Sequence, residues 1–124
     1  MRNLIILFFS AVSLFAFNSE LQLFNNLFSV MFDKQKIKVY TNKYSTLGGK
    51  LEIVHSCRDA DVVLGDVKCV GKPQFVLDYE EFKTNKNVIG GFYWRKGRPQ
   101  LRLKKSNLEK YKLFVSQDFE EYLN

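Results

Sequence analysis

The order of apolar and polar positions along this 124-residue chain changes period near residue 36, and each period predicts a different kind of element. In SELQLFNNLFSVMFDK, apolar residues recur at i, i+3, i+4 and i+7, at Phe24, Leu27, Phe28 and Met31. This spacing places one apolar stripe along a helix, for which Ser19 is a suitable N-cap. We predict an amphipathic helix whose stripe faces the core. Because Phe32 adjoins the stripe and an apolar N-terminus precedes it, contact with a membrane or a partner helix stays open.

Short β-rich runs follow the helix. They are IKVYT at 37–41, LEIV at 51–54, DVVLG at 61–65 and QFVLD at 74–78. The third run contains three consecutive apolar residues, Val62 to Leu64, which is typical of a strand covered on both faces. TLGGK and VGKP predict turns between these runs, while YEEFKTNKN has room for no more than two helical turns.

The stretch GGFYWRKGRPQLRLKK, residues 90–105, has the pattern of a β-hairpin. Phe92 and Trp94 fall on one face of its first strand and Tyr93 on the other, because successive side chains of a strand point to opposite faces. In its second strand, two leucines alternate with glutamine, arginine and lysine. A Lys96-Gly97 turn joins the two strands.

The end of the chain predicts two short helices. SNLE at 106–109 has the pattern of a capping box, with Ser106 as the N-cap of a helix that runs through Tyr111. In LFVSQDFEEYLN, Ser116 is a second candidate cap. The apolar stripe that follows it consists of Phe119, Tyr122 and Leu123.

Together these elements predict one small α/β domain. Its sheet is mixed, with about five or six strands, and it carries an N-terminal amphipathic helix, a glycine-turn hairpin and short C-terminal helices. Nothing in the chain repeats, and no Pro- or Ser-rich linker divides it. We expect the domain to cover residues 17–124.

The first residues have the layout of a secretory signal peptide. Arg2 supplies a positive charge, and residues 4–17 carry no charged side chain. A helix of this length reaches only ~21 Å, short of the ~30 Å hydrocarbon core. We expect a signal peptide at 1–16, cleaved after Ala16, and a periplasmic location. Because Leu14 is bulkier than the usual cleavage pattern allows, an uncleaved anchor stays open.

The chain has 19 basic and 13 acidic side chains, and part of this excess lies in the hairpin. Arg102 and Lys104 are expected on the solvent face because the leucines beside them face the core. The strand pattern does not require Arg95, Lys96 and Arg98 at the tip. These three basic residues suggest a site for an anionic partner surface.

Three interpretations of the tip are open. The first is a hairpin whose outer face is charged for structural reasons only. The second is docking on a membrane-anchored or envelope protein through Tyr93, Trp94, Arg95, Lys96 and Arg98, and weak contact with an anionic membrane surface stays open beside it. The third, single-stranded nucleic acid, fits basic and aromatic residues, but export makes nucleic acid an improbable partner.

Residues for catalysis are scarce. The chain has one histidine, His55, and no nucleophile set or phosphate-binding glycine loop. We expect neither an enzyme nor a cofactor. His55 with Cys57 and Cys69 would give a metal three ligands, a weak signal because structural sites show four ligands in paired motifs.

Cys57 and Cys69 are the only cysteines. In an oxidising compartment an even pair indicates one disulfide. If 61–65 is extended, however, it separates its ends by roughly 15 Å, whereas a bridge needs Cα atoms within about 7 Å. The chain would have to fold back at 66–68, so a bridge and two free thiols both stay open.

Several segments carry a family resemblance. In order they are IKVY, HSCRDADVVLG, KPQFVLDYEEF, NVIGGFYW and RPQLRLKKSNLEKYKLFVSQDFEEYL. Over about residues 37–123 this order resembles the small periplasmic regulatory proteins of the YfiR type. In that family a cysteine precedes a central apolar strand, a strand carries a glycine pair, and a terminal helix closes the domain. Gly90 and Gly91 match the glycine pair, and Asn107 matches a later asparagine.

The resemblance implies a periplasmic protein that represses a membrane-bound diguanylate cyclase by binding its outer part. It implies for Cys57 and Cys69 the role of a redox-sensitive pair. Our hypothesis is an exported, non-catalytic binding or regulatory protein. Two alternatives stay open. One is a structural accessory subunit of an envelope machine for secretion or flagellar assembly. The other is a small-ligand-binding protein with a pocket lined by Tyr93, Trp94 and Tyr40.

Overall fold

The computed structural model describes residues 19–123, so the expected signal peptide and its cleavage site lie outside the described residues. The elements in chain order are α2 (Ser19–Phe32), β2 (Ile37–Thr41), β3 (Leu51–Val54), η1 (Cys57–Asp59), β4 (Val62–Leu64), β5 (Gln74–Val76), α3 (Tyr79–Thr84), β6 (Val88–Arg95), β7 (Arg98–Leu103), α4 (Lys105–Lys110) and η2 (Gln117–Tyr122). Within this part of the chain no helix is both long and apolar enough to cross a membrane.

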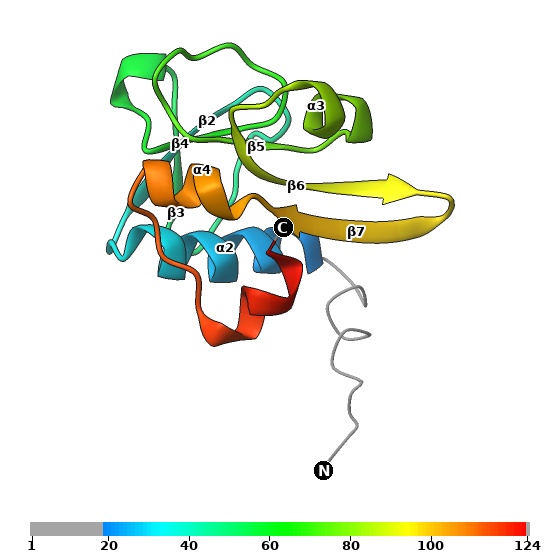
Figure 1. Ribbon diagram of the computed structural model, residues 1–124. Coiled ribbons are helices and arrows are strands. Elements are labelled where there is room, and N and C mark those ends of the chain that lie inside the picture. The colour runs from blue at the N-terminus through cyan, green and yellow to red at the C-terminus, as the bar shows by residue number, and fades with distance from the viewer. Residues whose placement is uncertain (1–18, 124) are drawn as a thin grey trace.

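The six strands form one sheet in the order β3-β2-β4-β5-β6-β7 (Figure 1). Neighbouring strands from β3 to β6 run parallel, and β7 alone runs antiparallel, beside β6. In Figure 1, α2 lies on one face of the sheet and α3 on the other. The structure therefore confirms a small α/β domain with a mixed sheet. We call the two faces of the sheet the α2 face and the α3 face.

The stripe of α2 is the centre of the core. Phe24, Leu27, Phe28 and Met31 are each at most 1% exposed. The ring of Phe28 meets that of Phe75 edge-on at 5.5 Å between centroids, and the ring of Phe24 meets that of Phe92 at 6.3 Å. Aromatic rings favour this edge-to-face arrangement. The predicted core helix is confirmed, and its apolar stripe is not free to bind a neighbouring subunit.

The central strand is shorter than its sequence pattern predicts. β4 contains only Val62 to Leu64, all fully buried, instead of residues 61–65. The chain leaves the strand at Gly65, whose φ of +103° is open to glycine but rarely to other residues. Strands β2 and β3 begin and end where the pattern places them.

A glycine pair lets β6 lie close to its neighbours. A Cβ atom added at Gly90 would lie 2.6 Å from the backbone oxygen of Arg102 and 3.2 Å from the Phe75 ring. A Cβ atom added at Gly91 would lie 3.0 Å from a methyl group of Val76. Both positions therefore need glycine for close packing, on opposite faces of the sheet.

The predicted capping box at Ser106 is wrong. Helix α4 begins at Lys105, its N-cap is Lys104, and no side chain caps it. The reason is that the sheet already fixes this backbone, because the Lys104 amide donates to the carbonyl of Ile89 at 2.8 Å. The carbonyl of Lys104 then accepts the first helical bond, from Leu108 at 3.0 Å. The helix starts directly where the sheet ladder ends.

The last predicted helix exists in a tighter form. Residues Gln117–Tyr122 form a 3₁₀ helix with Ser116 at the N-cap position. The hydroxyl of Ser116 makes no capping bond and is buried without a hydrogen-bond partner in the described structure. Leu123 then forms a parallel bridge with Leu103, so the chain end covers part of the edge of β7.

We predict that Gly90→Ala lowers the free energy of unfolding by about 2–3 kcal/mol, because overpacking of this kind costs roughly 1–3 kcal/mol. Gly91→Ala should cost less, since the Val76 methyl group can move while the Arg102 carbonyl belongs to the β6–β7 ladder. Urea unfolding of the two variants measures this order. An equal or larger effect at Gly91 would contradict it.

Candidate functional site

The predicted hairpin is formed by β6 and β7. Lys96 and Gly97 have φ values of +55° and +77°. Two successive residues with positive φ form the type I′ turn that suits a two-residue hairpin loop. The turn pairs Arg95 with Arg98, and the pairing continues from there towards Gly90 and Leu103. The predicted Lys96-Gly97 turn is confirmed.

The hairpin extends past the parallel part of the sheet (Figure 1). Strand β5 pairs with β6 only as far as Val76 opposite Gly91. Residues 92–95 of β6 are therefore paired on one side alone, with β7. The hairpin is held at its base by the core, while its tip stands free of the parallel strands.

Trp94 lies on the α2 face of the hairpin. By strand alternation it shares this face with Phe92, which is 5% exposed and packs on Phe24. Trp94 itself is 61% exposed. A large aromatic ring exposed to water contributes little to the stability of a hairpin. Tryptophan is, however, enriched at the hot spots of binding interfaces.

Tyr93 lies on the opposite, α3 face and is only 6% exposed. Its ring packs against the rings of Tyr79 and Phe82, with centroid distances of 5.4 and 5.6 Å. The structure therefore separates the expected docking residues onto two faces. Tyr93 fixes the base of the hairpin, whereas Trp94 is presented to solvent.

The pocket expected from Tyr93, Trp94 and Tyr40 is not formed. Tyr93 and Trp94 are on opposite faces of β6, because adjacent residues of a strand alternate. Tyr40 is on β2, and β4 and β5 lie between β2 and β6 in the sheet. The expected pocket needed Tyr93 and Trp94 on one face, which the alternation of the same strand excludes.

The α3 face of the hairpin carries a basic hollow of about 460 Å³. Its lining residues are Tyr93, Arg95, Lys96, Arg98, Gln100 and Arg102. Strand pairing sets Gln100 opposite Tyr93 and Arg102 opposite Gly91, so all three arginines face the same side. We call this surface the arginine face.

Sequence reasoning missed Gln100 and Arg102 as members of a site. It assigned Arg102 to the solvent face only because the leucines on either side face the core. The signal that identifies both residues is the two-residue turn, since it fixes the register of the strands. Because Arg95 pairs with Arg98, every second residue of β7 from Arg98 onward lies on the same face, and these residues are Gln100 and Arg102.

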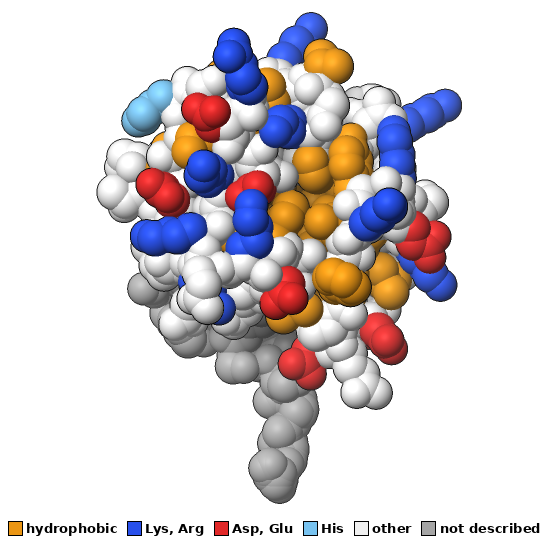
Figure 2. Space-filling model, turned by 90° about the vertical axis from the view of Figure 1, so that its left-hand side faces the viewer, with side chains coloured by type: hydrophobic (Ala, Val, Ile, Leu, Met, Phe, Trp, Pro, Cys, Tyr) orange, Lys and Arg blue, Asp and Glu red, His pale blue; other side chains and the backbone are white. Residues whose placement is uncertain are grey.

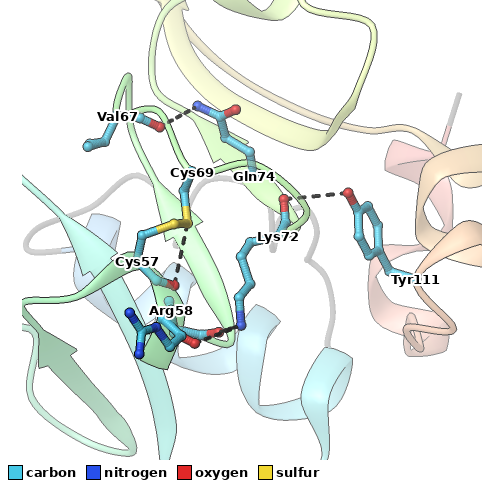
Figure 3. The surroundings of a disulfide bond; sticks show 8 residues. Cys57, Arg58, Val67, Cys69, Lys72, Gln74 and Tyr111 are labelled. Carbon is cyan, nitrogen blue, oxygen red and sulfur yellow. Dashed lines mark hydrogen bonds between the residues drawn. A yellow bond between two sulfur atoms is a disulfide. The ribbon is translucent and has the colours of Figure 1, made fainter.

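The two cysteines form a disulfide with their Cα atoms 5.6 Å apart (Figure 3). Cys57 lies in η1, before β4, and Cys69 lies in the loop that returns after β4. The chain folds back after the short β4 strand, which is what the bridge requires. The disulfide occupies both sulfur atoms, so the alternative of a metal site with His55 is wrong. The presence of a disulfide is consistent with an oxidising compartment.

Lys72 holds the loop that carries Cys69. Its ammonium group donates to the carbonyl oxygens of Arg58 at 3.1 Å and Ala60 at 2.8 Å (Figure 3). The backbone carbonyl of Lys72 lies 3.5 Å from the hydroxyl of Tyr111. The disulfide loop is thus tied both to η1 and to the segment that follows α4.

Three acidic residues meet near the start of α3. Asp78 is the N-cap of this helix and accepts a hydrogen bond from the amide of Glu81 at 3.2 Å. Partial burial, a hydrogen bond to the side chain of Asp66, and the negative charges of Asp66 and Asp78 raise the pKa of the Glu81 carboxyl group. The negative charges of Asp66 and Asp78 thus disfavour the ionised form of Glu81.

Comparison of the chain with protein-family models, with curated proteins and with solved structures finds no match.

The raised pKa of Glu81 predicts a pH dependence of stability. A carboxyl group that binds its proton more tightly in the folded state makes the protein less stable as pH rises from its ordinary pKa of 4.5 through its folded pKa. Glu81→Gln should remove this loss and stabilise the protein at pH 7. Thermal unfolding between pH 4 and 7 measures the effect. The control is Glu52→Gln, which makes the same charge change at the exposed Glu52 of β3. Equal effects of the two substitutions would contradict the prediction.

The disulfide should contribute about 3 kcal/mol to the free energy of unfolding. It joins residues 12 positions apart, and a bridge that closes a loop of about 15 residues stabilises a protein by roughly this amount. We expect the double variant Cys57→Ser, Cys69→Ser to unfold at correspondingly lower urea. Dithiothreitol should shift the wild type to the same midpoint and leave the variant unchanged. A wild-type midpoint that does not respond to reductant would contradict the bridge.

Proposed function

We propose that this protein is an exported, non-catalytic binding and regulatory protein that docks on a membrane-anchored signalling protein through the tip of the β6–β7 hairpin. The observation that carries the proposal is the free end of this hairpin, where Trp94 is 61% exposed beside Arg95, Lys96 and Arg98. Tryptophan and arginine are the residue types that dominate binding energy at protein interfaces.

The charge of the tip favours an acidic partner surface. Arg95, Lys96 and Arg98 are all exposed. The ion pairs found among residues 19–123 are Lys34 with Asp61 and Lys83 with Glu80, so neither involves the tip. Uncompensated charge at the end of a projecting hairpin speeds association with a surface of opposite sign.

The rigid base of the hairpin also supports docking. Phe92 is fixed against Phe24 on one face, and Tyr93 is fixed against Tyr79 and Phe82 on the other. Such a base orders the tip before binding. The loss of conformational entropy on association is then smaller, which increases affinity.

The proposed location is the periplasm. The apolar run at residues 4–17 has the pattern of an export signal, and a disulfide persists in oxidising compartments. The resemblance to YfiR-type proteins makes a membrane-bound diguanylate cyclase the proposed partner, with Cys57 and Cys69 as the pair whose redox state tunes repression.

Crosslinking in intact cells tests the proposal. A tagged wild-type chain should co-purify with one inner-membrane signalling protein, identified by mass spectrometry. Changing Arg95, Lys96 and Arg98 together to Glu should abolish this capture, because the tip then repels an acidic surface. Thiol trapping on the same sample should find Cys57 and Cys69 bridged. Capture of a set of envelope-machine subunits instead would contradict the proposed function.

Matched variants separate the tip from general charge effects. Changing Lys36, Lys50 and Lys105 together to Glu makes the same charge change at exposed positions outside the hairpin, and should leave capture intact. Trp94→Ala should reduce capture, while Phe114→Ala, at an aromatic residue 64% exposed elsewhere, should not. If the triple glutamate variant of the tip captured the partner as well as the wild type does, the hairpin would not be the docking element.

A further inference from the structure

Three guanidinium groups gather on the arginine face without an acidic neighbour in its lining. Arg95, Arg98 and Arg102 line the hollow, and the ammonium group of Lys96 adds a fourth positive charge at its rim. The other lining residues, Tyr93 and Gln100, are neutral. On the side of the molecule turned away from the hairpin, by contrast, acidic and basic side chains are interspersed (Figure 2). The arginine face is therefore a local concentration of one sign of charge.

This arrangement costs folding energy in the free protein. Arg95 and Arg98 are directly opposite each other in the ladder. Like charges at directly opposed positions of an antiparallel pair are destabilising. A hairpin that served only to close the sheet would be more stable with one of these arginines replaced by a neutral residue. A bound anion would remove the repulsion.

The guanidinium of Arg95 is held in place before any ligand binds. It lies over the ring of Tyr79, 4.1 Å from the ring centroid. Stacking on a ring uses the flat side of the guanidinium and leaves the N–H donors at its edge free. Tyr79 itself is fixed by packing on Tyr93. One donor fork of the hollow is thus oriented by the α3 helix.

Within the described part of the chain, the guanidinium donors of the arginine face have no acceptor. The lysine and asparagine side chains nearby do have acceptors, such as the carbonyls of Phe82 and Asn85 for Lys104, and those of Lys86 and Val88 for Asn107. Among residues 19–123, the side chains of Arg95, Arg98 and Arg102 donate no hydrogen bond and form no ion pair. Their donors are available to a ligand.

We propose that the arginine face binds a phosphate group, as part of a small anionic ligand or of a lipid headgroup. Arginine forks match the geometry of phosphate oxygens and form paired, charge-assisted hydrogen bonds with them. Four positive charges favour a multiply charged group such as phosphate over a single carboxylate. The hollow of about 460 Å³ has the size of a small-ligand site.

This site overlaps the docking surface proposed above, because Arg95, Lys96 and Arg98 belong to both. Trp94 lies on the other face of the hairpin, and Gln100 and Arg102 are not part of the tip. Phosphate binding can be measured on the isolated protein without the partner. Its failure is therefore distinguishable from failure of the proposed regulatory function.

The test is calorimetric titration of the full-length chain, kept in a non-ionic detergent at low salt, with inorganic pyrophosphate. We expect saturable binding in the wild type and binding weakened at least about tenfold, or ~1.4 kcal/mol, in the double variant Arg98→Gln, Arg102→Gln. The control is Lys36→Gln, Lys50→Gln, which removes the same charge from exposed residues near β2 and β3, at the opposite edge of the sheet. It should bind like the wild type.

A vesicle arm identifies the source of the phosphate. Wild type and double variant share the same apolar N-terminus, so a difference in their sedimentation with phosphatidylglycerol vesicles reports on the arginine face alone. Binding of pyrophosphate that depends on Arg98 and Arg102 supports a soluble ligand. Dependence seen only with vesicles supports a lipid headgroup.

Three results would overturn the proposal. The first is that neither arm depends on Arg98 and Arg102, and the second is that the lysine control weakens binding as much as the arginine variant does. The third concerns stability without ligand. Because the replaced groups repel their neighbours, the arginine variant should melt no lower than the wild type at low salt, and a lower melting temperature would remove the physical basis of the site.

Discussion

The register of the β6–β7 hairpin is the constraint on which both proposed surfaces depend. A two-residue turn with left-handed Lys96 and Gly97 pairs Arg95 with Arg98 and so fixes every later pair. A slip by one residue would exchange the two faces of the second strand. It would bury Arg102 and expose Leu101 and Leu103, which are at most 4% exposed. Core packing and turn geometry therefore select the same register, and that register gathers the arginines.

The aromatic core explains why the hairpin is rigid at its base and free at its tip. Phe92 is the last buried residue of β6 on the α2 face, and Tyr93 is the last buried one on the α3 face. Beyond them, the parallel sheet gives no further support, because β5 stops pairing at Gly91. Trp94 and Arg95 thus begin the part of the hairpin that solvent or a ligand can reach. The division follows from the shortness of β5, a strand of three residues.

Sequence patterns predicted the elements well and the contacts between them less well. The helix stripe and the strand alternation depend on burial, which repeats with the period of each element, and both were confirmed. The capping box at Ser106 failed because a long-range bond from Lys104 to Ile89 had already set the helix start. The cysteine pair stayed open because the return of the chain after Leu64 is a tertiary feature. The arginine face requires the strand register, which no local period contains.

The disulfide and the hairpin tip lie at opposite ends of the strands. Cys57 precedes the start of β4, whereas the tip follows the end of β6, which runs in the same direction. If the redox state of the bridge tunes docking, its effect has to cross the sheet. Gln74 offers a route, since its amide group donates to the carbonyl of Gly65 at 2.8 Å and accepts from Asn85 at 3.2 Å. It therefore joins the loop of Cys69 to the segment that leads into β6. Gln74 is thus a residue through which the disulfide loop and the segment before β6 share hydrogen bonds.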